Sequence, residues 1–347
     1  MDEIIIMKTH GSSALTKTME KACVIALGNF DGFHRGHQVV IGEAGRIAKK
    51  LSLPLAVFTT EPHPRSYFSP VQENYRLTPL ATRSHLLETF GVDIHHVLDF
   101  DESLASTPAH TFVSDILLNG MGAKHIVVGY DYHFGKGREG NVELLQELSE
   151  KLGFGLTVIN PVAVGVEGAA GEIYSSSLVR DVLKKGEARR AAGLLGHWWS
   201  INGIVVHGEK RGRELGYPTA NVNFGESIIP LYGIYAVRLT IEGREERFEG
   251  VANIGDRPTF DVEGELLEVY IFDFDEEIYD LAIEVDIVGF IRIEEKFDSI
   301  EALVKQIEDD CIVAKQILAD PENDKGHLKA PSLESYLKKH PIPHGKI

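Results

Sequence analysis

Cysteine and long apolar runs are scarce in this sequence. Of its 347 residues only Cys23 and Cys311 are cysteines, and neither lies in a CxxC or Cys/His spacing. We therefore expect two reduced structural thiols rather than a disulfide framework or a zinc site. No segment reaches the roughly 18 consecutive apolar residues of a membrane helix. The first twenty residues, MDEIIIMKTHGSSALTKTME, lack the apolar core of a secretory signal. These absences predict a cytoplasmic protein that does not bind a membrane.

Acidic residues outnumber basic residues in this sequence. The chain carries 35 Lys and Arg against 52 Asp and Glu, a formal net charge of −17. Such a charge repels a nucleic-acid backbone over long range, so no nucleic-acid partner is expected, and no obligate protein partner is evident. Small phosphorylated ligands stay compatible with it, because they need only a local cluster of amides, Lys, Arg or Mg²⁺.

From residue 22 to about residue 186, short apolar runs alternate with amphipathic segments. The runs CVIALG, LPLAVFTT and HIVVG predict strands, and Val40, Ala44 and Ile47 recur at helical spacing between the first two. Further helices are expected over residues 78–90 and after Thr107-Pro108. Repeated strand–helix units with near-continuous apolar strands favour a parallel sheet covered by helices on both faces.

After Gly196 the pattern changes to strands without intervening helices. Runs such as GIYAVRLTI, LLEVYIFDF and AIEVDIVGFIRI predict an antiparallel sheet, with Glu242-Gly243 as a hairpin turn. A total of about six strands favours a small closed barrel. A helix is expected from Ser299 to about Leu318, and the polar, proline-containing sequence beyond it predicts a loosely ordered tail.

The length suits two domains, each with its own core. We place the boundary in the basic helical segment that contains Gly186, which gives a first domain over residues 1–185, a second over residues 186–325 and a flexible tail over residues 326–347. The expected fold class is α/β plus β: a Rossmann-like parallel domain, then an antiparallel six-stranded β-barrel with a C-terminal helix.

The segment GNFDGFHRGH, from Gly28 to His37, lies directly between a predicted strand and a predicted helix. Ligands bind at this carboxyl edge of parallel sheets, and glycines before a helix N-terminus suit phosphate groups. His34 and His37 lie one turn apart, so that both imidazoles can stabilise charge on a leaving pyrophosphate. A surface pair or part of a metal site are the alternatives, although no third zinc ligand has fitting spacing. The segment resembles the HxGH signature of the nucleotidyltransferase superfamily.

Three further segments of the first domain resemble FAD synthetases. In YSSSLVRDVLKKG, Arg180 follows a run of serines where the family has Ser-Ser-Thr-x-Ile-Arg; this chain departs from it at Ser177 and Val179, and an ordinary helix cap is the alternative. EPHPR resembles the family's PHP segment, and GYDYHFG resembles its Gly-x-Asp-Phe-x-Phe-Gly loop, with Tyr132 in the first Phe position. The resemblance implies ATP contacts by Gly28, Asn29, Phe30, His34, Gly36, His37, Ser176, Ser177 and Arg180, and flavin contacts by Asp131 and Phe134.

The segment HGEKRGRELGYPTAN, residues 207–221, joins two predicted strands. Its spacing is not that of a P-loop, and a basic loop without a ligand is the alternative. Thr219 and Asn221 offer hard oxygen donors at alternate positions of an extended stretch, which suits Mg²⁺ completed by phosphates. The segment resembles the flavokinase pattern Gly-x-Lys-x-Gly followed by Gly-x-Pro-Thr-Ala-Asn, as do NIGDRPTF and GFIRIEEKF. The resemblance implies ATP contacts by Gly208, Lys210, Gly212, Pro218 and Thr219, a flavin contact by Arg292, and Mg²⁺ at Thr219 and Asn221.

Glu268 stands where flavokinases hold the base that takes a proton from the riboflavin 5′-hydroxyl. Strand alternation puts Glu268 with Tyr270 on one face and Leu267 with Val269 on the other, and it leaves open which face meets the substrate. Tyr270 replaces the family's usual His.

From about Cys23 to Leu318 the chain is thus similar to the bifunctional riboflavin kinase/FAD synthetases. The resemblance implies that residues 186–325 phosphorylate riboflavin with ATP and Mg²⁺, with Glu268 as base. It further implies that residues 1–185 adenylylate FMN with a second ATP, giving FAD and pyrophosphate, with His34, His37 and Arg180 stabilising the developing charge. Another HxGH nucleotidyltransferase, a non-catalytic flavin sensor and an RNA-binding relative are the alternatives. The barrel motifs argue against the first, the intact motifs against the second and the acidic charge against the third.

Overall fold

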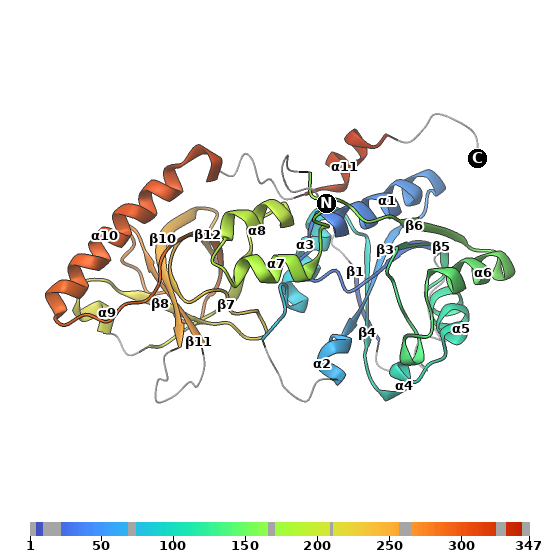
Figure 1. Ribbon diagram of the computed structural model, residues 1–347, viewed down its shortest axis with the longest axis horizontal. Helices are drawn as coiled ribbons and strands as arrows, with labels where there is room; N and C mark the ends of the chain where they lie inside the picture. Colours follow the sequence, from blue (N-terminus) through green and yellow to red (C-terminus); the bar gives the residue numbers. More distant parts are fainter. Residues whose placement is uncertain are drawn as a thin grey trace. The chain divides into compact units, whose positions relative to one another are not determined.

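The computed structural model describes residues 5–9, 22–68, 74–165, 171–208, 211–256, 265–323 and 331–341. The chain forms two compact units (Figure 1): residues 1–72, 80–175 and 330–347, and residues 73–79 with 176–329. The main segment of the second unit begins at Ser176, upstream of the boundary predicted at residue 186, because helix α7 (Ser176–Leu183) packs on α8 (Ala188–Leu195). No helix in the described ranges is long and apolar enough to cross a membrane.

The first unit is built on a six-stranded sheet, and every pairing in it is parallel. In spatial order the strands are β1 (Ile5–Thr9), β4 (Ile94–Asp99), β3 (Leu55–Glu61), β2 (Cys23–Leu27), β5 (Ala123–Gly129) and β6 (Gly155–Ile159). The central strand β2 is buried along its whole length. Burial of both faces explains its unbroken apolar sequence and confirms the predicted parallel sheet.

Helices cover both faces of this sheet. Cys23 and Ile25 point to one face, where they pack with helix η2 (Phe112–Gly120) and α6 (Val142–Leu152). Val24 and Ala26 point to the other, where α1 (Arg35–Leu51) and α3 (Leu80–Phe90) lie. The unit's short helices are α2 (Pro64–Phe68), α4 (Glu102–Ala105), α5 (Ala109–Thr111) and η3 (Lys136–Arg138). Both cysteines are free, and burial raises the pKa of Cys23 to about 12.

Two elements of this unit were not predicted. Strand β1 lies in the N-terminal segment, and helix α11 (Leu333–Lys339) lies in the tail that was expected to be loosely ordered. Helix α11 lies beside α1 (Figure 1). Its Leu333 and Tyr336 pack against the hydrophobic core that α1 covers. Glycines on α1 make room for them: a Cβ at Gly42 would lie 2.6 Å from the Tyr336 ring, and one at Gly45 would meet Leu333.

Replacing Tyr336 by Ala is expected to lower the free energy of unfolding of the first unit by about 1–2 kcal/mol, because a half-buried ring is lost from the α1 face. Urea unfolding followed by circular dichroism measures this. Lys339→Ala, on an exposed position of α11, is the matched control. Both tryptophans, Trp198 and Trp199, belong to the second unit, so their fluorescence transition should stay unchanged. Equal stability of the two variants would show that α11 does not contribute to stability.

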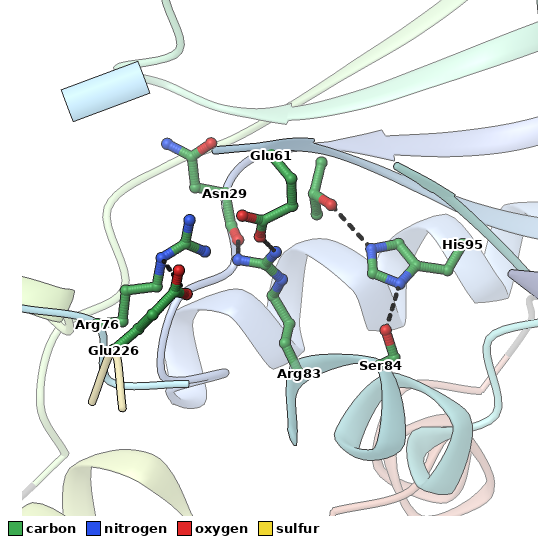
Figure 2. Close-up of polar contacts among 8 residues, drawn as sticks. Asn29, Glu61, Arg76, Arg83, Ser84, His95 and Glu226 are labelled. Atoms are coloured by element: carbon green, nitrogen blue, oxygen red, sulfur yellow. Dashed lines mark hydrogen bonds and ion pairs between the residues drawn. The ribbon is translucent and has the colours of Figure 1, made fainter. Parts of the chain in front are cut away.

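Strand β4 buries two adjacent histidines in the first unit. Nε2 of His95 lies 2.9 Å from Oγ1 of Thr59, and Nδ1 lies 3.0 Å from Oγ of Ser84 (Figure 2). These hydroxyls satisfy a neutral ring, which needs one donor and one acceptor. Burial, with further contributions from Arg83 and His96, lowers the pKa of His95 to about 3, and burial lowers the pKa of His96 to about 4.

The first unit should therefore lose stability in weak acid. Below the ordinary histidine pKa of 6.5 the unfolded chain binds two protons that the folded unit excludes. Each fully bound proton costs about 1.4 kcal/mol per pH unit, and at pH 6.5 the unfolded histidines are only half protonated, so the loss between pH 6.5 and pH 5 is about 3 kcal/mol. Urea unfolding at several pH values should show a slope that His96→Leu reduces by about one proton. Val97→Ala, which removes buried volume from the same strand, should shift stability equally at every pH. An unchanged slope in His96→Leu would contradict this account.

The second unit is a closed six-stranded barrel, as predicted. Its strands follow the order β10 (Arg247–Asp256), β11 (Glu265–Ile271), β8 (Thr219–Asn223), β7 (Ser200–Val206), β12 (Ala282–Arg292) and β9 (Gly233–Ile241). All of its pairings are antiparallel, and the predicted turn at Glu242-Gly243 joins β9 to β10. Short helices α9 (Arg211–Glu214) and η4 (Pro321–Asn323) complete the unit.

Helix α10 (Ile300–Ala319) packs on the outside of the barrel, as expected. Ser299 caps it by accepting a hydrogen bond from Ala302 N. At its other end, the buried guanidinium of Arg238 on β9 donates to the carbonyl groups of Leu318, at 2.7 Å, and Asn323. A buried cation at the C-terminus satisfies carbonyl groups that the helix itself leaves free.

Candidate active sites at the sheet edge and on the barrel

The loop between β2 and α1 carries the first site and lies at the carboxyl edge of the sheet. Phe30, Gly32 and Phe33 have positive φ values of 49°, 84° and 44°. For the two phenylalanines this conformation costs on the order of 1–3 kcal/mol each, so other contacts must hold it. Both rings are buried, Phe33 N donates to Phe30 O at 3.1 Å, and Gln38 Nε2 donates to Phe33 O at 2.8 Å. The loop is therefore a fixed, strained platform for the residues that follow it.

His34 and His37, both predicted site residues, lie in contact at the start of α1. His34 is the N-cap of the helix, and its Nδ1 accepts a hydrogen bond from His37 N at 3.3 Å. The two rings stack with centroids 3.5 Å apart, and Phe30 meets the His37 ring at 5.2 Å. Glycine at position 36 favours this packing, because a Cβ there would lie 3.1 Å from the His34 ring, which is a tight contact. Gly28 and Asn29 complete the loop, with Asn29 exposed.

The other ATP-contacting residues predicted for this site belong to the second unit. Ser176 and Ser177 open α7, and Arg180 follows in the same helix. Arg180 Nε donates to Tyr75 O at 2.7 Å, and its guanidinium lies 5.3 Å from the centre of the Tyr75 ring. These contacts fix Arg180 within its own unit. Its role beside the two histidines stays a prediction.

The predicted flavin residues of the first unit differ in their surroundings. Asp131 is exposed in the loop after β5. Phe134 is buried in the core, 5.6 Å from Phe112 and 5.8 Å from Tyr132. Phe134 therefore serves the core packing of this loop, and its flavin contact, like that of Asp131, stays a prediction.

The second site is a cavity of about 1290 Å³ on the barrel. Glu268 and Tyr270 both line it, whereas Leu267 and Val269 on the opposite strand face are fully buried. The strand face that carries Glu268 is therefore the one that borders the cavity. Most of the predicted kinase residues also line this cavity: Gly208, Gly212, Pro218, Thr219, Asn221 and Arg292. Lys210 lies outside the described residues.

A row of polar side chains crosses three neighbouring strands of the cavity wall. Asn221 on β8 and Asn253 on β10 pair directly with Glu268 on β11, and Thr219 pairs with Tyr270. Directly opposed residues of antiparallel strands project to the same face, so this row presents a carboxylate and two amides together. The sequence analysis did not select Asn253. Its Oδ1 is buried and has no hydrogen-bond partner within the described part of the chain.

Arg292 is not free to move in this cavity. Its Nε and Nη2 bind the carboxylate of Asp310 on α10 at 2.9 and 2.7 Å, and Gln306 donates to the same carboxylate at 3.0 Å. Asp310 is 4 % exposed, which makes this a largely desolvated bidentate pair. Asp310 was also missed by the sequence analysis, which read α10 only by its apolar positions.

Comparison with known proteins identifies both domains. A family model described as FAD synthetase matches residues 16–172, and one described as riboflavin kinase matches residues 195–318. Relatives named bifunctional riboflavin kinase/FMN adenylyltransferase include those of Haemophilus influenzae, 37% identical over 85% of this chain and 94% of the relative, and of Bacillus subtilis, 38% identical over 85% and 92%. A crystal structure from Streptococcus pneumoniae, titled a macrolide-efflux protein, superposes with a TM-score of 0.79 at 32% identity, covering 90% of this chain and 99% of that one.

The parallel-sheet unit with the first site precedes the closed barrel with the second along the chain. The matches also span most of each relative. Both observations lead to one assignment. This chain belongs to the bifunctional riboflavin kinase/FMN adenylyltransferase family.

Proposed function

We propose that this protein phosphorylates riboflavin on the barrel and then adenylylates the resulting FMN at the sheet edge, producing FAD and pyrophosphate. The proposal is carried by one observation: Thr219, Asn221 and Glu268 line a cavity of about 1290 Å³ in the same chain that carries the stacked His34–His37 pair. The proposed setting is the cytoplasm, with small molecules as the partners.

In the kinase step, Glu268 accepts the proton of the riboflavin 5′-hydroxyl as its oxygen attacks the γ-phosphorus of ATP, and ADP leaves. Asn221 and Asn253 flank Glu268 on the neighbouring strands and orient groups around it. Arg292, held by Asp310, keeps a fixed position at the cavity wall for the flavin. Gly208, Lys210, Gly212 and Pro218 belong to the segment proposed to bind ATP.

The donors in this cavity fit Mg²⁺. Within the described part of the chain, no group of three or more His, Cys, Asp or Glu side chains could hold a metal ion. Mg²⁺ does not need one, because it binds through one or two protein oxygens plus phosphates and water. Asn221 Nδ2 donates weakly to Thr219 O at 3.5 Å, which leaves Oδ1 for the ion. Thr219 and Asn221 would hold Mg²⁺, which when bound neutralises phosphate charge.

In the adenylyl transfer step, a phosphate oxygen of FMN attacks the α-phosphorus of a second ATP, and the bond to the β-phosphate breaks to release pyrophosphate. His34 and His37 donate to the phosphates at the N-terminus of α1, where the helix already favours negative charge. Arg180, Ser176 and Ser177 are proposed to contact the same ATP, and Asp131 and Phe134 the flavin.

The test is chromatography of riboflavin incubated with the purified protein, ATP and Mg²⁺. FMN should appear first and FAD second. FMN alone would retain the kinase and reject adenylyl transfer. Unchanged riboflavin together with unconverted FMN would reject both activities.

A further inference from the structure

A buried arginine lies behind the nucleotide loop of the first unit. Arg83 is on α3 and its side chain is 1% exposed. Its Nη1 donates to Asn29 O at 3.3 Å, and its Nη2 binds the carboxylate of Glu61 (Figure 2). Building on the proposed adenylyltransferase function, we infer that Arg83 is a positioning residue for that reaction. It acts through the loop that carries His34 and through the end of β3.

The two groups that Arg83 binds belong to neighbouring chain segments at one sheet edge. β2 and β3 pair in parallel, with Leu27 opposite Phe58, and Gly28 N donates to Phe58 O at 3.4 Å. Asn29 lies two residues after the end of β2, and Glu61 is the last residue of β3. One guanidinium therefore contacts the chain where it leaves β2 and where it leaves β3. The HxGH loop begins at the first of these points and the PHP segment at the second.

The hydrogen bond from Arg83 to Asn29 O matters for His34 because of where Asn29 lies in the loop. The next residue, Phe30, has a φ of 49°, and Phe33 repeats this conformation just before His34. A loop that is held in an unfavourable backbone conformation depends on its surrounding contacts. The hydrogen bond from Arg83 fixes the carbonyl group immediately before the strained stretch. Without it the stretch can relax, and the imidazoles at its end shift relative to the phosphates.

Glu61 gives the arrangement its geometric precision. The planar guanidinium presents donors in fixed directions, so one side chain can serve a carboxylate and a carbonyl group at once. A lysine ammonium retains the charge that Glu61 needs but lacks this fork. If Arg83 only formed an ion pair with Glu61, lysine could replace it. If Arg83 positions the loop, lysine cannot replace it fully.

The experiment compares Arg83→Lys, Arg83→Met and Glu61→Gln with Arg46→Met. Arg46 forms an ion pair with Glu43 on α1, outside the loop, and is the matched control. Steady-state adenylylation of FMN is measured on folded protein, with riboflavin kinase activity of the same samples as the internal reference. Hydrogen exchange of the peptide covering residues 28–38 reports on the loop.

We expect Arg83→Met to lower kcat for adenylylation by about 100-fold, with a much smaller change in KM for ATP, because misplacement affects alignment more than binding. Arg83→Lys should retain only part of the wild-type kcat for adenylylation, and Glu61→Gln should lower this kcat by about tenfold. The loop should exchange faster in all three. Kinase activity and Arg46→Met should stay near the wild-type values.

Full activity in Arg83→Lys, or losses in Arg83→Met and Glu61→Gln no larger than in Arg46→Met, would refute the positioning role and leave the proposed function intact. If Arg83→Met does not fold, Arg83→Lys and Glu61→Gln decide the question by the same criteria. A wild-type protein that converts riboflavin to FMN but forms no FAD would instead refute the adenylyltransferase function, and the role of Arg83 with it.

Discussion

His34→Ala is expected to stop FAD formation while FMN formation from riboflavin continues. The imidazole lies at the N-terminus of α1, stacked on His37 at 3.5 Å. In the proposed reaction the leaving pyrophosphate gains negative charge there. Removing one preorganised donor of this kind costs about 100- to 1000-fold in rate. The barrel has its own cavity, proposed to bind ATP and the flavin, so the kinase should keep its wild-type rate. Chromatography of FMN and FAD from riboflavin measures both steps in one sample.

His34 has a second role that the experiment must separate. As the N-cap of α1 it accepts the hydrogen bond of His37 N, and loss of a cap costs about 1 kcal/mol of stability. His34→Asn keeps a side-chain acceptor at the cap and removes the imidazole. We expect both variants to lose adenylylation. Recovery of activity in His34→Asn would show that the cap, not the imidazole, carries the effect, and would contradict the proposed donor role.

The sequence predicted those elements whose residues carry their own periodic signal. The central strands of the first unit read as strands because they are apolar on both faces, and α10 was predicted from the helical spacing of its apolar residues. β1 and α11 were missed because each is short and depends on a distant partner, β4 for the strand and the glycine-lined face of α1 for the helix. No local pattern reports such a partner.

The sites were predicted unevenly for the same physical reason. His34, in the loop that follows β2, falls at the sheet edge, and Glu268, in the middle of β11, falls in the barrel cavity, because strand geometry places them there. Arg83 and Asp310 are charged residues on helices, where solvent exposure is the usual expectation. Their burial follows from the tertiary packing that brings Glu61 and Arg292 to them, which a single sequence does not encode locally.

Glu268→Gln is expected to abolish FMN formation from riboflavin while FAD formation from supplied FMN continues. Glutamine keeps the shape of the side chain and its place between Asn221 and Asn253, but it cannot accept the hydroxyl proton. Loss of a general base costs about 100- to 10,000-fold in rate. Quenching of riboflavin fluorescence should show that the variant still binds the flavin.

Glu265→Gln is the matched control, because Glu265 lies on the same strand and contacts Tyr232 rather than the cavity row. It should retain both activities. The pairing of Glu268→Gln with His34→Ala makes the test stringent, since each variant should lose the activity that the other keeps. A mixture of the two should therefore form FAD from riboflavin, with FMN released by one protein and consumed by the other. Loss of both activities in either variant would contradict two chemically independent sites, because neither substitution removes a group from the other unit.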